Sequence, residues 1–508
     1  MFKGHPKGLL AAALANMGER YGFYTMMAIL VLFLQAKFGL DETNAGLIYS
    51  VFYFSIYILA FVGGIIADKT RNYKGTIMMG QILMGVGYFL IAIPTATPVS
   101  NTPLFLGMTC FGLFVIAFGN GLFKGNLQAL VGQMYDDPNY SKLRDSGFSW
   151  FYMFINIGAI FAPFTAIGIR SWWLGTKGFT YNAALPELCH SQINGTINAE
   201  GTARITTLAT EVSKGNTVSD LTEFAKTYLN TFTEGFHYAF GAAIAAVLVS
   251  LTIYMINKKN FPNPKKVGAK SAAQEAGTIE MDAKEVKQRI YALLAVMGVV
   301  IFFWFSFHQN GLTMTYFAKD YTLLQIGSWK ISAEIFQSMN PFFVVFLTPI
   351  IIAIYGWLRS KDMEPSTPKK IAMGMAIAGL GFVVMTVGSY VSNLPLLSDV
   401  KAMGGLPDAA RVTPYLLIGT YFILTVAELF ISPLGISFVS KVAPPQFQGV
   451  MQGAWLGATA IGNLLLFIGA ILYQNIPIWL TWTVFVSVCF ISMMTMLMMV
   501  KWLERVSK

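Results

Sequence analysis

Residues 9–33 of the 508-residue chain read LLAAALANMGERYGFYTMMAILVLF. A helix of this length crosses a bilayer, because about 20 apolar residues span the hydrocarbon core. Two adjacent charges, Glu19 and Arg20, nevertheless lie in its middle. An ionisable side chain at the bilayer centre costs roughly 2.5–3.5 kcal/mol on insertion scales. We therefore expect the pair to face protein or a watery cavity and to mark a pathway or a binding site.

The composition is that of an integral membrane protein. The chain is 55% hydrophobic and only 12% charged, whereas soluble domains have about 25% charged residues. Its net charge of +10 comes from connectors between apolar runs, which indicates membrane orientation and not nucleic-acid binding. The cysteines and histidines are scattered, so we expect no disulfide framework and no metal site. The basic start of the chain leads into residues 9–15 without a clear cleavage context, so no cleavable signal peptide is expected.

Twelve apolar segments have the length of membrane spans. They lie near 8–35, 44–67, 75–94, 102–122, 147–169, 234–256, 289–312, 332–357, 370–393, 413–438, 448–473 and 477–500. Basic residues gather in alternate connectors, which fall on one side of the membrane if both termini are cytoplasmic. The sequence therefore predicts an all-α, multi-pass protein of the cell (inner) membrane.

Two long connectors divide the chain. Residues 171–233 are polar and predicted to be external, with a short helix expected near 221–228. Residues 257–288 are Lys-rich and are expected to be a cytoplasmic linker. The predicted domains are therefore a six-helix bundle at 1–256 and a second at 289–508. Two six-span halves around a midplane site are a common plan of secondary transporters.

Polar side chains recur at helical spacing inside the spans. Asn16, Glu19, Arg20, Phe23, Tyr24 and Met27 share one helix face, and Asn120, Lys124 and Gln128 share another. Further polar positions within the spans are Ser149, Tyr152, Asn156, Trp304, His308, Gln337, Asn340, Tyr421, Thr425, Glu428 and Ser432. Buried charges need partners. The charged residues expected in the core of the bundle are Glu19, Arg20, Lys124 and Glu428, which amount to two negative and two positive charges. One interpretation of the Glu19–Arg20 pair is purely structural, a buried ion pair that fixes helix packing.

A zwitterion fits such a cavity. Its carboxylate would lie towards Arg20 and Lys124, and its ammonium group towards Glu428. Aromatic residues at Tyr24, Tyr57, Trp304 and Trp455 would supply apolar walls that tolerate different side chains.

Several motifs resemble those of the proton-coupled oligopeptide transporters, a branch of the major facilitator superfamily. In chain order they are GERYGFY at 18–24, GGIIAD at 63–68 followed by Lys74-Gly75, GLFKGN at 121–126, FYMFINIG at 151–158, FQSMNP at 336–341, ELFISPLG at 428–435 and KVAP at 441–444. The matches follow the family order from the first span to the eleventh. The resemblance implies the major facilitator fold and uptake of di- and tripeptides driven by a proton gradient, with no bound cofactor.

The resemblance also assigns roles by position. Arg20 and Lys124 would hold the peptide carboxylate, and Glu428, Asn156 and Asn340 the amino end and backbone. Tyr24, Tyr57 and Trp455 would line side-chain pockets, and Ser432 lies on the Glu428 face. Asp68 and Lys74 would form a cytoplasmic conformational latch. The expected partners are small peptides and the lipid bilayer, without nucleic acid, and the expected state is a monomer.

Four departures concern proton coupling. Asn16, Phe23, Met27 and His308 stand where the family pattern has Glu, Tyr, Arg and Glu. The resemblance implies that the Arg and Glu at the positions of Met27 and His308 pair as an external gate in the family. Replacing only one of them would leave the other as a buried, unpaired charge, whereas replacing both leaves no unpaired charge. We hypothesise that coupling has shifted to Glu19 or His308, or is weakened. A neutral hydrogen-bonding role for His308 is an equally good interpretation.

Other functions stay open at this point. The nearest alternative is a transporter for another small solute, such as an anion or a modified amino acid. A receptor that senses peptides without transporting them is a second. An enzyme is not expected, because no metal-ligand pair, nucleophile–base arrangement or phosphate loop is visible in the sequence.

Overall fold

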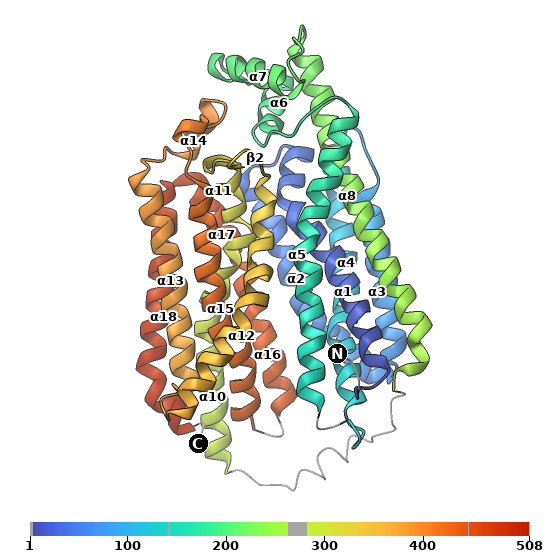
Figure 1. The fold of residues 1–508 in the computed structure, drawn as a ribbon, viewed down its shortest axis with the longest axis vertical. Coiled ribbons are helices and arrows are strands. Elements are labelled where there is room, and N and C mark those ends of the chain that lie inside the picture. The colour runs from blue at the N-terminus through green and yellow to red at the C-terminus, as the bar shows by residue number, and fades with distance from the viewer. Residues whose placement is uncertain (1–3, 141–142, 263–281, 445–446, 507–508) are drawn as a thin grey trace.

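The computed structural model describes residues 4–140, 143–262, 282–444 and 447–506. Within these residues, twelve helical segments are long and apolar enough to cross a membrane, which confirms the predicted number of spans. They lie side by side in a tall bundle (Figure 1). The predicted linker at 257–288 falls largely outside the described residues, and the division into two domains at that point stays a prediction.

The first six spans come from the N-terminal half of the chain. They are α1 (Gly8–Phe38), α2 (Glu42–Thr70), α3 (Tyr73–Ala92), α4 (Thr102–Met134), α5 (Arg144–Thr176) and α8 (Leu221–Asn257), which is followed by η2 (Lys258–Asn260). Local chemistry sets several ends. Gly39 ends α1 in the left-handed region at φ 66°, and the Asp41 side chain then caps α2 by accepting from the backbone N–H of Asn44.

The other six spans come from the C-terminal half, and three of them are broken. Their parts are α10 (Ala283–Phe307), η3 (His308–Gly311) and α11 (Thr313–Tyr321); η4 (Ala333–Ser338) and α12 (Met339–Ser360); α13 (Thr367–Val391); α15 (Pro414–Val442); α16 (Gln448–Leu464) and α17 (Leu466–Asn475); and α18 (Ile478–Val506). The 3₁₀ turn η3 interrupts the seventh span at His308, one of the candidate coupling residues.

Small elements gather at one end of the molecule. They are α6 (Leu185–Ile193), α7 (Ala199–Val212), β1 (Gln325–Ile326), β2 (Trp329–Lys330), α14 (Leu397–Ala402) and η5 (Asp408–Ala410). The strands β1 and β2 form a two-residue antiparallel hairpin. We call residues 177–220, which contain α6 and α7, the insert, and the end of the molecule that carries it the insert end. Both termini lie towards the opposite end, the terminal end (Figure 1).

The connector predicted at 171–233 is shorter than expected. Helix α5 continues to Thr176, and the short helix expected near 221–228 is the start of α8, which runs without a break into the sixth span. The Asp220 side chain caps α8 by accepting from the backbone N–H groups of Thr222 and Glu223. The insert therefore connects the ends of α5 and α8, two long helices of the N-terminal half.

The two halves meet along pairs of spans. Helix α2 packs against α16 and α17, and α5 packs against η4 and α12. Within the N-terminal half, α2 and α4 approach very closely at two glycines: a Cβ on Gly63 would lie 2.2 Å from the Gly121 carbonyl oxygen, and one on Gly121 would lie 2.4 Å from the Leu59 carbonyl oxygen. This approach places the following turn of α4, which carries Lys124, beside α2.

Candidate functional site

Glu19 and Arg20 form a buried ion pair with each other. Two Arg20 nitrogens donate to the two Glu19 carboxylate oxygens at 2.6 and 2.7 Å. Asn120 on α4 donates to the same carboxylate at 2.8 Å, and the Arg20 guanidinium lies 4.6 Å from the Phe23 ring centre. Both charges are therefore neutralised inside the bundle, as burial requires. The pair has the geometry of a buried ion pair within α1, and a substrate carboxylate at Arg20 would share the guanidinium with Glu19.

Lys124 is the cation with a more open environment. Its ammonium group lies 5.0 Å from the centre of the Tyr57 ring on α2, and its side chain is half-buried, whereas Glu19 is fully buried. The charges of Arg20 and Glu19 both act on it. Lys124 thus contributes positive charge beside the Glu19–Arg20 pair.

The carboxylate of the C-terminal half is Glu428 on α15. Asn340 on α12 donates to it at 2.8 Å and to the Thr425 hydroxyl at 3.1 Å. Glu428 and Asn340 are half-buried. The charge of Glu428 reaches Tyr24 and Tyr57 in the opposite half, and the charge of Arg20 reaches Tyr24 as well. We call Arg20 and Lys124 the cationic pole and Glu428 the anionic pole. Both tyrosines lie within electrostatic reach of Arg20 and of Glu428, which come from different halves.

Tyr152 was noted in the sequence only as a polar position of the fifth span. Its side chain is 56% exposed, and the charge of Glu428 acts on it, with Tyr24 and Tyr57 nearby. It therefore belongs to the same group as the predicted residues. Its place four residues before Asn156, on the same helix face, was the available signal.

His308 lies at the contact between the halves. Its Nδ1 is 2.5 Å from the Asn463 side-chain oxygen, and its Nε2 is 3.4 Å from the Tyr53 hydroxyl. The ring stacks on Trp304 with centres 4.8 Å apart. A neutral ring satisfies both contacts when Nδ1–H donates to Asn463 and Tyr53 donates to Nε2. These contacts fit the interpretation of His308 as a neutral hydrogen-bonding residue, which is the alternative to a role in proton coupling.

A row of aromatic rings connects His308 to Lys124. The ring centres of His308 and Tyr53 are 4.9 Å apart, and those of Tyr53 and Tyr57 are 5.8 Å apart. Tyr57 in turn faces the ammonium group of Lys124. The row therefore links His308, a candidate coupling residue, with Lys124 of the cationic pole.

Other predicted residues lie in different surroundings. Asn156 donates to the backbone carbonyl of Tyr152 in its own helix at 3.2 Å. Trp455 is buried against α15, where a Cβ on Gly435 would lie 2.0 Å from its ring. Ser432 is half-buried.

Asp68 is exposed at the terminal end and accepts a hydrogen bond from Tyr73, and the backbone carbonyl of Lys74 accepts one from Tyr254 at 3.2 Å. Asp68 and Lys74 are thus separate from the two poles.

Charged residues near the ends of the spans also join the halves. Arg170 on α5 pairs with Glu334 on η4, and both side chains are fully buried. Glu42 at the start of α2 is fully buried and pairs with Lys401 at 2.8 Å and with Lys319 at 3.6 Å. Sequence reasoning missed these residues, because a charge near the end of a span ordinarily reaches water. They join the two halves at the insert end of the molecule.

No group of three or more His, Cys, Asp or Glu side chains suited to a metal ion occurs among the residues that the structure describes.

Comparisons with known proteins agree with the sequence motifs. The model of the POT family matches residues 74–279 and 264–481. A peptide transporter of Yersinia enterocolitica is 28% identical over 91% of this chain and 87% of its own length. A dipeptide and tripeptide permease B of Xenorhabdus bovienii is 25% identical over 91% and 86%.

Solved structures share the fold. A peptide transporter of the POT family in complex with sulfate superimposes with a TM-score of 0.73 over 100% of this chain and 96% of that one, at 23% identity. A POT family transporter in complex with 5-aminolevulinic acid gives a TM-score of 0.70 at 20% identity, over 100% and 98%. The predicted major facilitator fold is thereby confirmed. The family model spans well over half of the sequence, so this chain belongs to the POT family.

Proposed function

We propose that this chain is a secondary transporter that imports dipeptides and tripeptides by alternating access, driven by an inward proton gradient. Membership of the POT family and relatives named as peptide transporters and permeases support the reaction. The observation that carries the proposal is the pair of opposite poles, with Lys124 in one half and Glu428 in the other.

The poles suit the two ends of a short peptide. Lys124 would bind the terminal carboxylate by a charge-assisted hydrogen bond, with Arg20 close by. Glu428, oriented by Asn340, would accept from the terminal ammonium group. Tyr24 and Tyr57 would line the space between the poles. Because the poles lie in different halves, a peptide that contacts both would favour the conformation in which the halves are near each other.

Orientation follows from the basic connectors. Lys69 and Arg71 at the end of α2, and Arg359 and Lys361 at the end of α12, lie at the terminal end. The positive-inside rule then places this end and both termini in the cytoplasm and the insert outside. We place the protein in the inner membrane, with peptides and lipid as its partners. A monomer is the proposed working unit, because one chain supplies both poles.

The direct test is uptake of labelled dialanine into proteoliposomes that contain the purified protein. We expect accumulation above the external concentration when an inward proton gradient is imposed, and only equilibration without it. Unlabelled tripeptide should compete, and free alanine should compete poorly. 5-Aminolevulinic acid, the ligand named for one structural neighbour, tests the alternative of a modified amino acid. Binding without accumulation would favour a receptor and reject the transporter.

Two variants test the poles. Lys124→Gln and Glu428→Gln keep the side-chain size and remove the charge, so we expect each to lower dialanine uptake at least about tenfold, since a hydrogen bond to a charged group contributes roughly 1.5–3 kcal/mol. Lys226→Gln and Glu223→Gln, both exposed at the start of α8, are the matched controls and should transport normally. Full uptake by both pole variants would refute the proposed site.

A further inference from the structure

The insert is fixed to the N-terminal half. Helix α6 buries Leu185, Leu188 and Cys189, and α7 buries an apolar stripe that includes Ile205 and Leu208. Helix α6 packs against α8 and α1, where the His190 ring nitrogen Nε2 lies 2.8 Å from the Ala36 carbonyl oxygen. The insert must therefore move together with this half.

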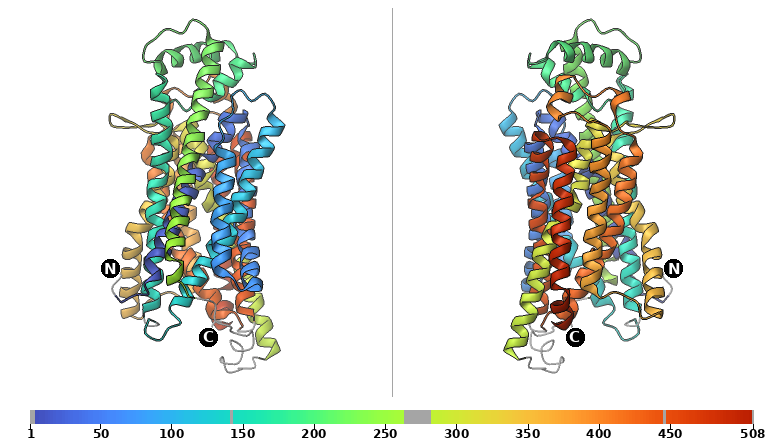
Figure 2. Two further views of the ribbon diagram at one scale, coloured as in Figure 1. Left: turned by 90° about the vertical axis from the view of Figure 1, so that its right-hand side faces the viewer. Right: turned by 90° about the vertical axis from the view of Figure 1, so that its left-hand side faces the viewer.

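The same insert reaches across to the C-terminal half through polar side chains on and beside α6 and α7. Glu187 on α6 pairs with Lys401 on α14 at 3.1 Å. Asn198, before α7, donates to the backbone carbonyl of Ala402 at 2.8 Å. Glu211 near the end of α7 pairs with Lys330 on β2 at 3.2 Å. Both views of Figure 2 show the insert lying across the top of the helical bundle.

The loop after α14 fits against the insert. Gly404 and Gly405 have φ values of +70° and +106°, a left-handed conformation that side chains rarely adopt. A Cβ on Gly404 would lie 2.9 Å from the Cβ of Arg204 on α7. The glycines thus turn the chain directly beneath the insert, which lets backbone and side chain meet closely.

Lys401 connects three parts of the molecule. Its ammonium group pairs with Glu187 of the insert and with the buried carboxylate of Glu42 on α2, while Lys401 itself belongs to the C-terminal half. Burial acts to lower the pKa of Lys401, but Glu187 and Glu42 together raise it above its ordinary value. The lysine therefore stays charged over the physiological pH range.

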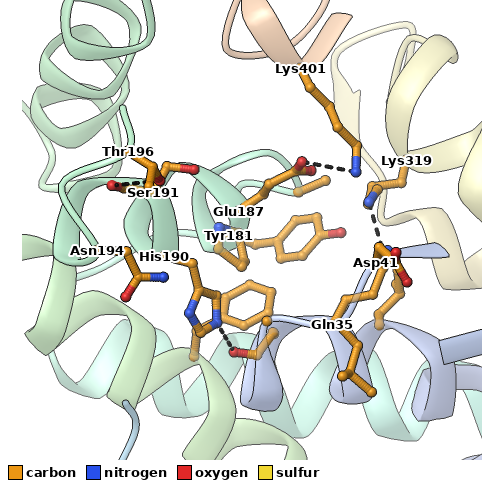
Figure 3. Close-up of a pocket in the computed structure, with 17 residues that line it drawn as sticks. Gln35, Asp41, Tyr181, Glu187, His190, Ser191, Asn194, Thr196, Lys319 and Lys401 are labelled. Carbon is orange, nitrogen blue, oxygen red and sulfur yellow. Dashed lines mark hydrogen bonds and ion pairs between the residues drawn. The ribbon is translucent and has the colours of Figure 1, made fainter. Parts of the chain in front are cut away.

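A cavity of about 240 Å³ lies below α6, and its walls come from α1, the insert and the C-terminal half (Figure 3). Lys401 and Glu187, which line it, point toward each other, and His190 lines it as well. The insert is therefore not packed solidly onto the C-terminal half. The insert is held by the polar contacts at Glu187, Asn198 and Glu211 together with the close packing of Gly404 against Arg204.

We infer that the insert is a clamp that holds the insert end closed by bridging the two halves. If the halves separate at this end, the insert moves with the N-terminal half while α14 and β2 move with the other, so the contacts of Glu187, Asn198 and Glu211 must break. Contacts that exist in only one conformation shift the balance towards it. The exposed Glu211–Lys330 pair adds little, whereas Glu187 acts through Lys401, which also binds the buried Glu42.

The test measures the distance between the halves directly. In a background in which Cys110, Cys189 and Cys489 are replaced by Ala, spin labels at Ser100→Cys and Ser392→Cys report on the insert end, because both serines are exposed in connectors of opposite halves. The clamp variant combines Glu187→Gln, Asn198→Ala and Glu211→Gln, which leaves Glu42 and both lysines in place. Glu200→Gln, exposed on the same insert, is the control.

We expect double electron–electron resonance in nanodiscs to give a long-distance population at least threefold larger in the clamp variant than in the parent or the control. Equal distance distributions in all three would overturn the inference. A second experiment applies if the clamp variant fails to fold. Asn198→Cys and Ala402→Cys are joined by a short cleavable thiol reagent, which should abolish the long distances between the spin labels. Cleavage of the reagent should restore these distances. Long distances that persist in the joined protein would also overturn it.

The inference rests on the proposed alternating access, but its readout needs no substrate. If dialanine is not transported while the distances respond as expected, the clamp stands and only the substrate assignment fails.

Discussion

At the scale of single residues, His308 is the side chain whose role matters most for coupling. Its neutral form is fully satisfied by Asn463 and Tyr53, and protonation would remove the acceptor that Tyr53 uses. A change of protonation would therefore disturb the row of rings that leads through Tyr57 to Lys124. This arrangement gives a physical route by which a proton could influence the cationic pole.

We predict that His308→Gln flattens the pH dependence of dialanine uptake, because glutamine cannot take up the proton that would remove the acceptor used by Tyr53. Glutamine retains an amide donor for Asn463, which limits structural damage. The measurement is initial uptake rate against external pH, with and without an imposed gradient. An unchanged profile would eliminate His308 as the switch and leave Glu19 as the coupling candidate.

His190 in the insert makes stability depend on pH. Burial lowers its pKa, an effect only partly offset by the hydrogen bond with the Ala36 carbonyl, so the folded protein keeps the ring neutral where the unfolded chain, with a pKa near 6.5, takes up a proton. Stability is therefore fully present above about pH 6.5 and declines as the pH falls below it.

We predict that the melting temperature of the parent falls more between pH 7.5 and 5.5 than that of His190→Gln, in which the side-chain amide can still donate to Ala36. Differential scanning fluorimetry in detergent measures both. Parallel curves would show that His190 titrates alike in the folded and unfolded chain.

At the scale of elements, the approach of α2 and α4 depends on glycine. A Cβ on Gly121 would lie 2.4 Å from the backbone carbonyl oxygen of Leu59, where a flexible side chain cannot give way. Gly125, one turn along the same helix, is exposed with nothing within 4 Å of a Cβ. The two positions form a matched pair on one helix.

We predict that Gly121→Ala destabilises the protein by about 1–3 kcal/mol, the usual cost of overpacking, and lowers uptake, because α4 carries Lys124. Gly125→Ala should be neutral or slightly stabilising, since alanine favours a helix. Thermal unfolding and dialanine uptake are measured on both variants. Equal behaviour of the two would mean that the close approach of α2 and α4 is not needed.

The elements also show what the sequence could and could not reveal. Apolar length identified every span. Helical spacing put Glu19 and Arg20 on one polar helix face and Lys124 on another, because both signals are local. The interruption of the seventh span at His308 was not predicted, since no proline marks it. Helix α7 was also missed, although Asn198 caps it and Ile205, Leu208 and Val212 follow helical spacing. The polar composition of the connector concealed that pattern.

At the scale of the whole molecule, the closed insert end depends on pairings between residues far apart in the sequence. Arg170 on α5 and Glu334 on η4 are fully buried together, and Ser332 accepts from the guanidinium at 3.0 Å. The guanidinium also lies 4.0 Å from the centre of the Tyr181 ring. No local pattern links positions 170 and 334, so only the tertiary fold could reveal this pair.

A double-mutant cycle tests how the pair joins the halves. Arg170→Met leaves Glu334 as a buried, unpaired carboxylate, and Glu334→Met leaves the guanidinium, so we predict that each destabilises the protein by about 3–5 kcal/mol. The double variant should lose less than either single one, because apolar side chains of similar volume need no partner. Lys369→Met, which removes a partly exposed pair with Glu504 at 3.2 Å, is the control and should cost less than about 1 kcal/mol. Unfolding is followed by intrinsic fluorescence. If the two single losses simply add in the double variant, Arg170 and Glu334 act independently, and their contact is not what holds α5 against η4.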